Sequence, residues 1–223
     1  MYGELHMNQT IPEIGKQKRA CIAFYNGFLD LMEEKDFEDI TVSDIIAAAD
    51  YSRSAFYSNF LDKDDMLRHM LDYFVLVYVH STYDTYRDYT GEIKDSLYLP
   101  MLNTFRIAYE NRRFYHLLFS GRFPGYGLNE FQAATERFFR AAFSVDHQEW
   151  PNAFDWDMYW FIKGREIFDF IIYWDRCDWR YTAEYMAKNS AMLLPKVSSV
   201  RSTPGRELVI IKDMFNPPNK CSG

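Results

Sequence analysis

The chain has 223 residues, of which 26% are charged, and its formal net charge is −7. This length allows one large domain or a small domain joined to a larger one. No apolar run approaches the roughly 20 residues that a transmembrane helix needs, and the N-terminus lacks the apolar core of a signal peptide. These features argue against a membrane-spanning protein and predict a cytoplasmic one.

The three cysteines are far apart in the sequence, at Cys21, Cys177 and Cys221. No CxxC pair or Cys/His cluster accompanies them, so the sequence offers no structural zinc site. We expect reduced thiols, no bound metal and no cofactor.

A flexible arm is expected at residues 1–14, and the sequence predicts four helices after it. Apolar residues at 3/4 spacing predict an amphipathic helix within 16–35. Thr41 is a suitable N-cap for a short second helix, and an acidic residue three positions later completes a capping box. Ser52 and Asp62 are suitable N-caps for a short third helix and a long fourth one.

Helical patterns continue through most of the remaining chain. The helices expected there span residues 94–110, a short stretch after Asn111, 128–143, 156–174 and 182–194. Pro100 either kinks the first of these or marks its true first turn. No strand pattern of useful length precedes residue 200, and the tail at 197–223 has one apolar patch, Leu208–Ile211. The sequence therefore predicts an all-α fold.

The stretch "TVSDIIAAADYSRSAFYSNF", residues 41–60, has the form of a helix-turn-helix. In such a motif the second helix enters the DNA major groove and its N-terminal residues meet base edges. If Phe56 and Phe60 face inward, one edge of this helix presents an arginine, a tyrosine and small hydroxyl groups. Arginine can bind guanine through two hydrogen bonds, and serine or tyrosine can bind phosphate. The alternative is a plain helical hairpin, in which Tyr57 packs and Arg53 is solvated.

The same stretch resembles the N-terminal DNA-binding domain of the tetracycline-repressor (TetR) family, over about residues 16–67. The residues that carry the resemblance are Thr41, Val42, Asp44, Ile45, Ala49, Ser52, Phe56, Tyr57, Phe60, Lys63 and Leu67. It implies an all-helical homodimer with a helix-turn-helix DNA-binding domain at 15–67. A larger helical domain at 68–196 would hold a small-molecule pocket and the dimer interface.

The resemblance also implies roles for individual residues. Thr41, Tyr57 and Lys63 would bind backbone phosphates, and the residues around Arg53 would read bases. The complete set expected to contact DNA is Lys16, Thr41, Ser43, Ser52, Arg53, Ser54, Ala55, Tyr57, Ser58 and Lys63.

Two features depart from the usual family pattern. Asp36 and Asp50 stand where the family usually has glycine, but aspartate tolerates left-handed backbone better than most residues. Residues 14–70 carry seven Lys or Arg against eleven Asp or Glu, a net charge of −4. DNA-binding domains are usually basic. We therefore expect few phosphate contacts.

Of the 41 aromatic residues, 32 lie beyond residue 70. A cavity for an apolar or aromatic ligand is one physical reason for this excess, and packing between helices is the other. His80 and His116 are the candidate polar groups of such a cavity, although a lone histidine among apolar neighbours is more often a core residue.

The apolar segment "DMYWFIKGREIFDFIIYW" is expected to form a subunit interface, the alternative being the buried central helix of a monomer. The residues expected at the dimer contact are Ile162, Gly164, Ile167, Phe168, Ile171, Tyr185, Met186 and Leu193.

No catalytic motif such as GxSxG or HExxH, and no phosphate-binding glycine loop, is present, so we expect no enzyme. The leading interpretation is a one-component transcriptional repressor that binds a palindromic double-stranded DNA operator as a homodimer and is released by a small molecule. A helical small-molecule binding protein that does not use DNA is the alternative, favoured by the acidic N-terminal domain. A helical enzyme with a bound cofactor is a more distant one.

Overall fold

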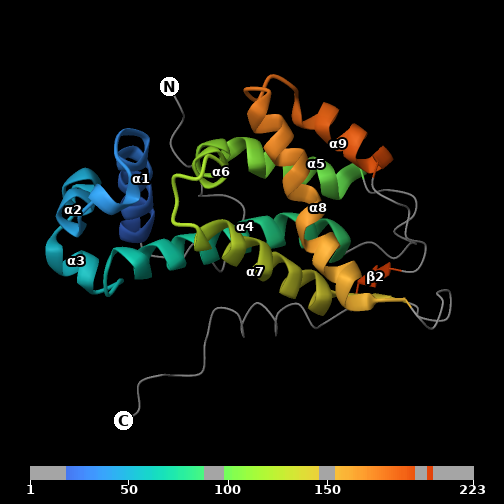
Figure 1. Cartoon of the computed structure of the whole chain (residues 1–223), viewed down its shortest axis with the longest axis horizontal. Coiled ribbons are helices and arrows are strands. Elements are labelled where there is room, and N and C mark those ends of the chain that lie inside the picture. Colours follow the sequence, from blue (N-terminus) through green and yellow to red (C-terminus); the bar gives the residue numbers. More distant parts are fainter. Residues whose placement is uncertain (1–18, 88–97, 146–153, 194–199, 203–223) are drawn as a thin grey trace, which may run out of the picture. The chain divides into compact units, whose positions relative to one another are not determined.

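The computed structural model describes residues 19–87, 98–145, 154–193 and 200–202 (Figure 1). Its helices are α1 (Arg19–Glu34), the 3-10 helix η2 (Phe37–Asp39), α2 (Val42–Ala49), α3 (Arg53–Tyr57), α4 (Lys63–Arg87), α5 (Tyr98–Glu110), α6 (Arg112–Phe119), α7 (Tyr126–Ala142), α8 (Trp156–Arg176) and α9 (Ala183–Leu193). The predicted helical fold is confirmed. The predicted arm, Lys16 and the Leu208–Ile211 patch lie outside the described residues.

One short sheet adds to the helices and was not predicted. β1 (Phe143–Val145) and β2 (Val200–Ser202) pair antiparallel, with Ser144 opposite Arg201. Strands of three residues are too short to show a period of two in the sequence, which explains why pattern reading missed them.

The helices form two compact units. The first comprises Met1–Val77 and Ala108–Phe131, and the second comprises Tyr78–Ile107 and Gln132–Gly223. The first unit therefore joins α1 to α3 with most of α4, with α6 and with the start of α7. The functional boundary expected at residue 67 stays a prediction.

The core of the first unit is aromatic. Phe24 and Phe28 of α1 are fully buried, and Phe74 of α4 stacks on Phe114 of α6 with ring centroids 3.7 Å apart. Gly27 lets α1 approach α2 closely, because a Cβ built there would lie 2.9 Å from the backbone nitrogen of Ala49. This contact fixes α2 on α1 and so sets the position of the turn that follows α2.

Side-chain caps mark several helix starts, as the sequence predicts. Asp62 accepts a hydrogen bond from the backbone N–H of Asp65 at 2.8 Å, at the start of α4. Pro100 lies in the first turn of α5, where its missing N–H costs no helical hydrogen bond. Asn111 occupies the N-cap position of α6, but its side chain makes no capping hydrogen bond there.

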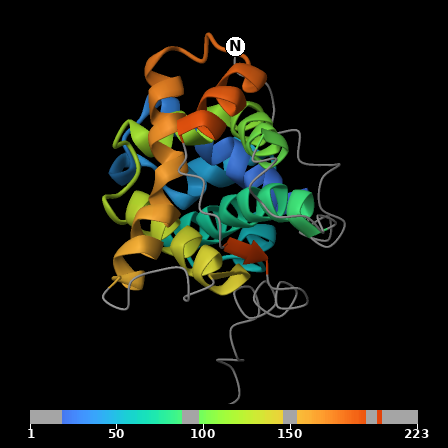
Figure 2. The same cartoon turned by 90° about the vertical axis from the view of Figure 1, so that its right-hand side faces the viewer.

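The second unit is built around α8. Trp174 of α8 is fully buried, and its ring packs edge-on against Phe105 of α5 at 5.7 Å. Gly164 of α8 lies directly against the backbone of Glu136 in α7. Helices α7 and α8 are the yellow and orange ribbons of Figure 2. Arg106 of α5 pairs with Glu184 of α9 at 3.0 Å. Helix α8, which contains the apolar segment noted in the sequence, thus forms the core of the second unit.

Candidate nucleic-acid interface

The N-terminus of α2 carries the capping box that the sequence predicts. The Thr41 hydroxyl accepts a hydrogen bond from the backbone N–H of Asp44 at 3.2 Å, and the Asp44 carboxylate accepts one from the backbone N–H of Thr41 at 2.9 Å. These bonds to Thr41, with Lys35 nearby, hold the pKa of the Asp44 carboxyl below its ordinary value of 3.8. The backbone N–H groups of Thr41 and Asp44 at the exposed N-terminus of α2 thus both have partners within the box.

The turn between α2 and α3 depends on Asp50. Its backbone is left-handed, at φ 54° and ψ 45°, and it ends α2. Glycine is the usual residue in this conformation, and aspartate is among the few others that adopt it at modest cost. The tolerance expected of this residue is confirmed. Asp36, the other position compared with glycine, has extended backbone at φ −76° and needs no glycine.

Helix α3 has a buried apolar face and an exposed polar face. Phe56 and Phe60 are buried, and both rings pack against Phe24 of α1, at 5.3 and 6.0 Å. Tyr57 is 47% exposed and Arg53 is also exposed, on the opposite side. This is the orientation that the spacing of the two phenylalanines predicts.

The outer edge of α3 is internally ordered. The Arg53 guanidinium lies 5.4 Å from the centre of the Tyr57 ring and donates a long hydrogen bond of 3.5 Å to its hydroxyl. Ser52 caps the helix by accepting from the backbone N–H of Ala55 at 3.2 Å. Ser58 donates to the backbone carbonyl of Ser54 at 2.8 Å. An arginine, a phenol and three small hydroxyl side chains thus share one exposed surface.

Ser43 and Thr41 are exposed at the start of α2, and Ala55 of α3 is half-buried. Lys63 stands apart from the other predicted contacts. Its ammonium donates to the backbone carbonyls of Phe37 at 2.5 Å and Ile40 at 2.8 Å. That Lys63 binds a backbone phosphate stays a prediction, and in the structure two of its three N–H donors serve the protein.

The chain matches the family model described as bacterial regulatory proteins, tetR family, over residues 29–70. This part of the chain is thus similar to the corresponding region of tetR-family regulators. The matched residues include the capping box, the Asp50 turn and all of α3.

Individual relatives agree with this placement. The uncharacterized HTH-type transcriptional regulator YwcC of Bacillus subtilis (strain 168) is 33% identical over 57 residues, which are 26% of each chain. The similarity thus spans about a quarter of this curated relative's length.

Two solved structures show the same fold over most of the chain. The TetR transcriptional regulator from Streptococcus agalactiae 2603V is similar over 78% of this chain and 93% of its own, at 21% identity and a TM-score of 0.53. The fatty acid degradation regulator FadR from Bacillus halodurans is similar over 80% of this chain and 96% of its own, at 13% identity and a TM-score of 0.60. The predicted combination of an N-terminal helix-turn-helix with a larger helical region is confirmed.

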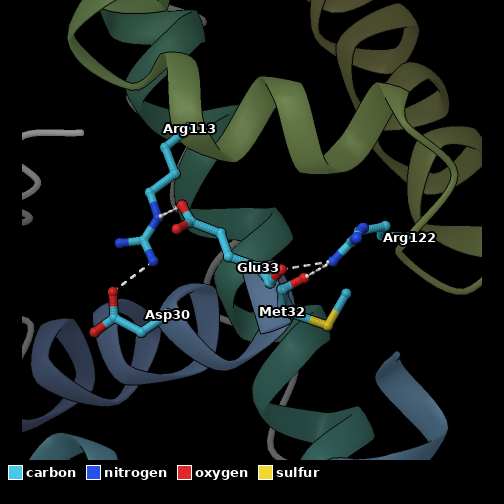
Figure 3. A network of polar contacts seen from close by, with 5 residues as sticks. All are labelled: Asp30, Met32, Glu33, Arg113 and Arg122. Atoms are coloured by element: carbon cyan, nitrogen blue, oxygen red, sulfur yellow. Dashed lines mark hydrogen bonds and ion pairs between the residues drawn. The ribbon is translucent and has the colours of Figure 1, made fainter. Parts of the chain in front are cut away.

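A polar network that the sequence did not predict connects α6 with the end of α1 (Figure 3). Arg113 of α6 pairs with Asp30 and Glu33 of α1, each at 2.5 Å. Arg122, in the loop after α6, donates to the backbone carbonyls of Met32 at 2.7 Å and Glu33 at 3.0 Å. These carbonyls have no partner within α1, so Arg122 caps α1 from another element.

The predicted ligand-binding histidines are not brought together. His116 is exposed on α6, whereas the side chain of His80 lies outside the described part of the structure. Their ligand-binding role stays a prediction. Within the described residues no helix has the length and apolarity to cross a membrane, and no group of three His, Cys, Asp or Glu could hold a metal ion.

The residues expected at the dimer contact fall into two groups. Five of them are buried within the protomer: Gly164, Ile167, Phe168, Ile171 and Met186. Their side chains pack inside their own chain, so this part of the expected interface is corrected to core. The other three are exposed, namely Ile162, Tyr185 and Leu193. A sequence pattern can identify an apolar helix but does not say which of its faces the same chain covers.

Proposed function

We propose that the protein is a ligand-responsive, one-component transcriptional repressor that binds a palindromic DNA operator as a homodimer and is released by a small molecule. The observation that carries the proposal is the exposed edge of α3, where Arg53 and Tyr57 lie side by side on a helix held from within by Phe56 and Phe60. Arginine and hydroxyl groups on such an edge suit base and phosphate recognition.

Residues 15–67 bind the DNA in this proposal, and the helices of 68–196 hold the ligand and the dimer contact. A helix as short as α3, five residues long, gives one protomer few base contacts. Two-fold symmetry supplies a second half-site about one turn of DNA away.

Exposed apolar side chains of α8 and α9 support the dimer. On α8 they are Met158, Phe161, Ile162 and Tyr173, and on α9 they are Tyr185, Met192 and Leu193. Apolar side chains in such number at the surface of two neighbouring helices are typical of a protein–protein contact.

The ligand is proposed as an apolar or aromatic small molecule, because aromatic residues are concentrated beyond residue 70. It acts by preferring a dimer geometry in which the two α3 helices no longer match adjacent major-groove faces. The solved relative FadR is a fatty acid degradation regulator, but its similarity to this chain is one of fold, so it does not narrow the ligand further.

Selection of binding sites from a random DNA library tests the proposal. The wild type should select a palindrome, and Arg53→Ala should relax the preference at one position in each half-site, by about 1–3 kcal/mol. Tyr57→Phe should weaken all sequences about equally. Arg68→Ala is the matched control, because it removes the same charge from an exposed position on α4.

Two results would contradict the proposal. If Arg53→Ala selects the same sequence with unchanged preference, Arg53 does not read a base. If the wild type selects no sequence at all, the protein does not act on DNA, and the helical small-molecule binding protein becomes the better interpretation.

A further inference from the structure

Lys63 joins the start of α4 to the segment that connects α1 with α2. Its ammonium lies between two backbone carbonyl oxygens, 2.5 Å from that of Phe37 and 2.8 Å from that of Ile40. The same nitrogen lies 4.1 Å from the centre of the Phe37 ring. An ammonium has three N–H donors and no acceptor, so two of the three donors are occupied inside the protein.

The segment that Lys63 holds leads directly into the N-terminus of α2. The side chains of Phe37 and Ile40 are buried, at 6% and 1% exposure, which anchors the segment in the core. Thr41 follows Ile40 and caps α2. The carbonyl bonds from Lys63 therefore determine where the backbone enters α2, and with it the position of the Thr41 N–H and hydroxyl.

We propose that Lys63 is a positioning residue for DNA binding: it acts by holding the 37–40 backbone and hence the N-terminus of α2, rather than by bonding a phosphate itself. This inference rests on the proposed DNA-binding function. The compact ammonium fits between two converging carbonyls next to an aromatic face, whereas the planar guanidinium of arginine is suited to the paired oxygens of a phosphate.

The two roles predict different salt dependence. Each phosphate that a side chain neutralises contributes about 0.9 to the slope of log K against log salt concentration. Loss of a phosphate contact from both protomers of a dimer would therefore reduce the magnitude of this slope by about 1.8. Loss of a positioning contact weakens binding at every salt concentration and leaves the slope unchanged.

The experiment compares wild type, Lys63→Ala and Lys63→Arg on the DNA sequence that the wild type selects from a random library. Binding is measured by fluorescence anisotropy over a series of salt concentrations. We expect both variants to bind about tenfold or more weakly, with the wild-type slope. Lys35→Ala is the matched control, since it removes one positive charge near α2, where Lys35 pairs with Asp44 at 3.7 Å, without touching the two carbonyls.

Hydrogen exchange gives a second readout that does not depend on DNA. In both Lys63 variants the backbone amides of Ile40 and Thr41 should exchange faster than in the wild type, while those of α6 should not. Circular dichroism establishes that each variant is folded, and Lys63→Met, which retains the apolar stem against Phe37, replaces Lys63→Ala if that variant does not fold.

Three outcomes would overturn the assignment. One is a slope lowered by about 1.8 in Lys63→Ala with unchanged exchange at Ile40 and Thr41, which is the behaviour of a phosphate ligand. Another is wild-type affinity in Lys63→Arg. The last is a wild type that binds no DNA selectively, which rejects the proposed function and this assignment together, whereas the first two reject the assignment alone.

Discussion

Replacement of Gly164 tests how α7 and α8 pack. A Cβ built on Gly164 would lie 2.6 Å from the Cα and 2.7 Å from the Cβ of Glu136. The two helix backbones would have to separate by about 0.8 Å to restore an ordinary contact of 3.4 Å. Because the obstacle is backbone rather than the end of a flexible side chain, the neighbour cannot simply rotate away.

The expected cost follows from two opposing effects. Overpacking of a close helix contact costs about 1–3 kcal/mol, and the better helix propensity of alanine offsets about 1 kcal/mol of it. Gly164→Ala should therefore lower the free energy of unfolding by up to about 2 kcal/mol, which corresponds to a Tm lower by up to about 8 °C for a chain of this size.

Gly127→Ala is the matched control for this prediction. Gly127 also lies in a helix, but a Cβ there would meet nothing nearer than the Cβ of Phe123 at 3.5 Å. This variant should be at least as stable as the wild type. Urea unfolding followed by circular dichroism measures both. Equal stability of the two variants would refute the close α7–α8 contact, and a changed mass of Gly164→Ala in sedimentation would place Gly164 at a subunit interface after all.

Three further changes act on caps and turns. Asp50→Gly should raise the free energy of unfolding by about 1 kcal/mol, because it relieves a left-handed residue, as thermal unfolding can measure. Asp44 has a lowered pKa in the folded protein, so its stabilisation is complete above its ordinary pKa of 3.8 and is lost as the pH falls through the lower folded value. Asp44→Asn should therefore be less stable than wild type at neutral pH. The difference in the free energy of unfolding between the two should disappear at acid pH. Arg122→Ala, which removes the donor to two α1 carbonyls, should cost about 1 kcal/mol.

Each of these changes has a result that would contradict it. A less stable Asp50→Gly would mean that the aspartate side chain contributes more than its backbone costs. A gap between wild type and Asp44→Asn that persists to strongly acid pH would show that ionisation of Asp44 is not its cause. An Arg122→Ala variant with wild-type stability would mean that water caps α1 equally well.

Local features of the first unit were predictable because they depend on neighbours in sequence. The Thr41–Asp44 box, the Ser52 cap and the inward Phe56 each follow from residues within one or two helical turns. The left-handed Asp50 was also predictable, since a tight turn between two short helices needs such a residue and aspartate tolerates it.

Contacts between distant residues were not predictable in the same way. Lys63 has the spacing of a family phosphate ligand, yet its hydrogen-bond partners lie 23 and 26 positions earlier in the chain. Gly164 was expected at a contact with a second subunit, but the helix it meets is α7 of its own chain. In both cases a residue's chemistry was readable from the sequence, whereas its partner depended on tertiary packing.

Contacts between distant residues also change how the acidic charge of the first unit should be interpreted. Several of its carboxylates have partners inside the unit. Arg113 binds Asp30 and Glu33, and Tyr126 donates to Asp64 at 3.0 Å. Net charge therefore overstates the negative potential that α3 presents. From residue 51 to 61, Arg53 is the only charged residue.

Salt dependence of DNA binding measures the charge that actually faces the phosphates. Few cations accompany α3, so the dimer should behave as if it neutralises roughly four to eight phosphates, with a slope of log K against log salt between about −4 and −7. Titrations of the selected operator at several salt concentrations give this slope. A much steeper one would mean that cations outside the described residues, such as Lys16, bind the backbone. A slope near zero would mean that hydrogen bonds from neutral groups such as the Tyr57 hydroxyl and the α2 N-terminus carry the affinity, since neither releases a counterion.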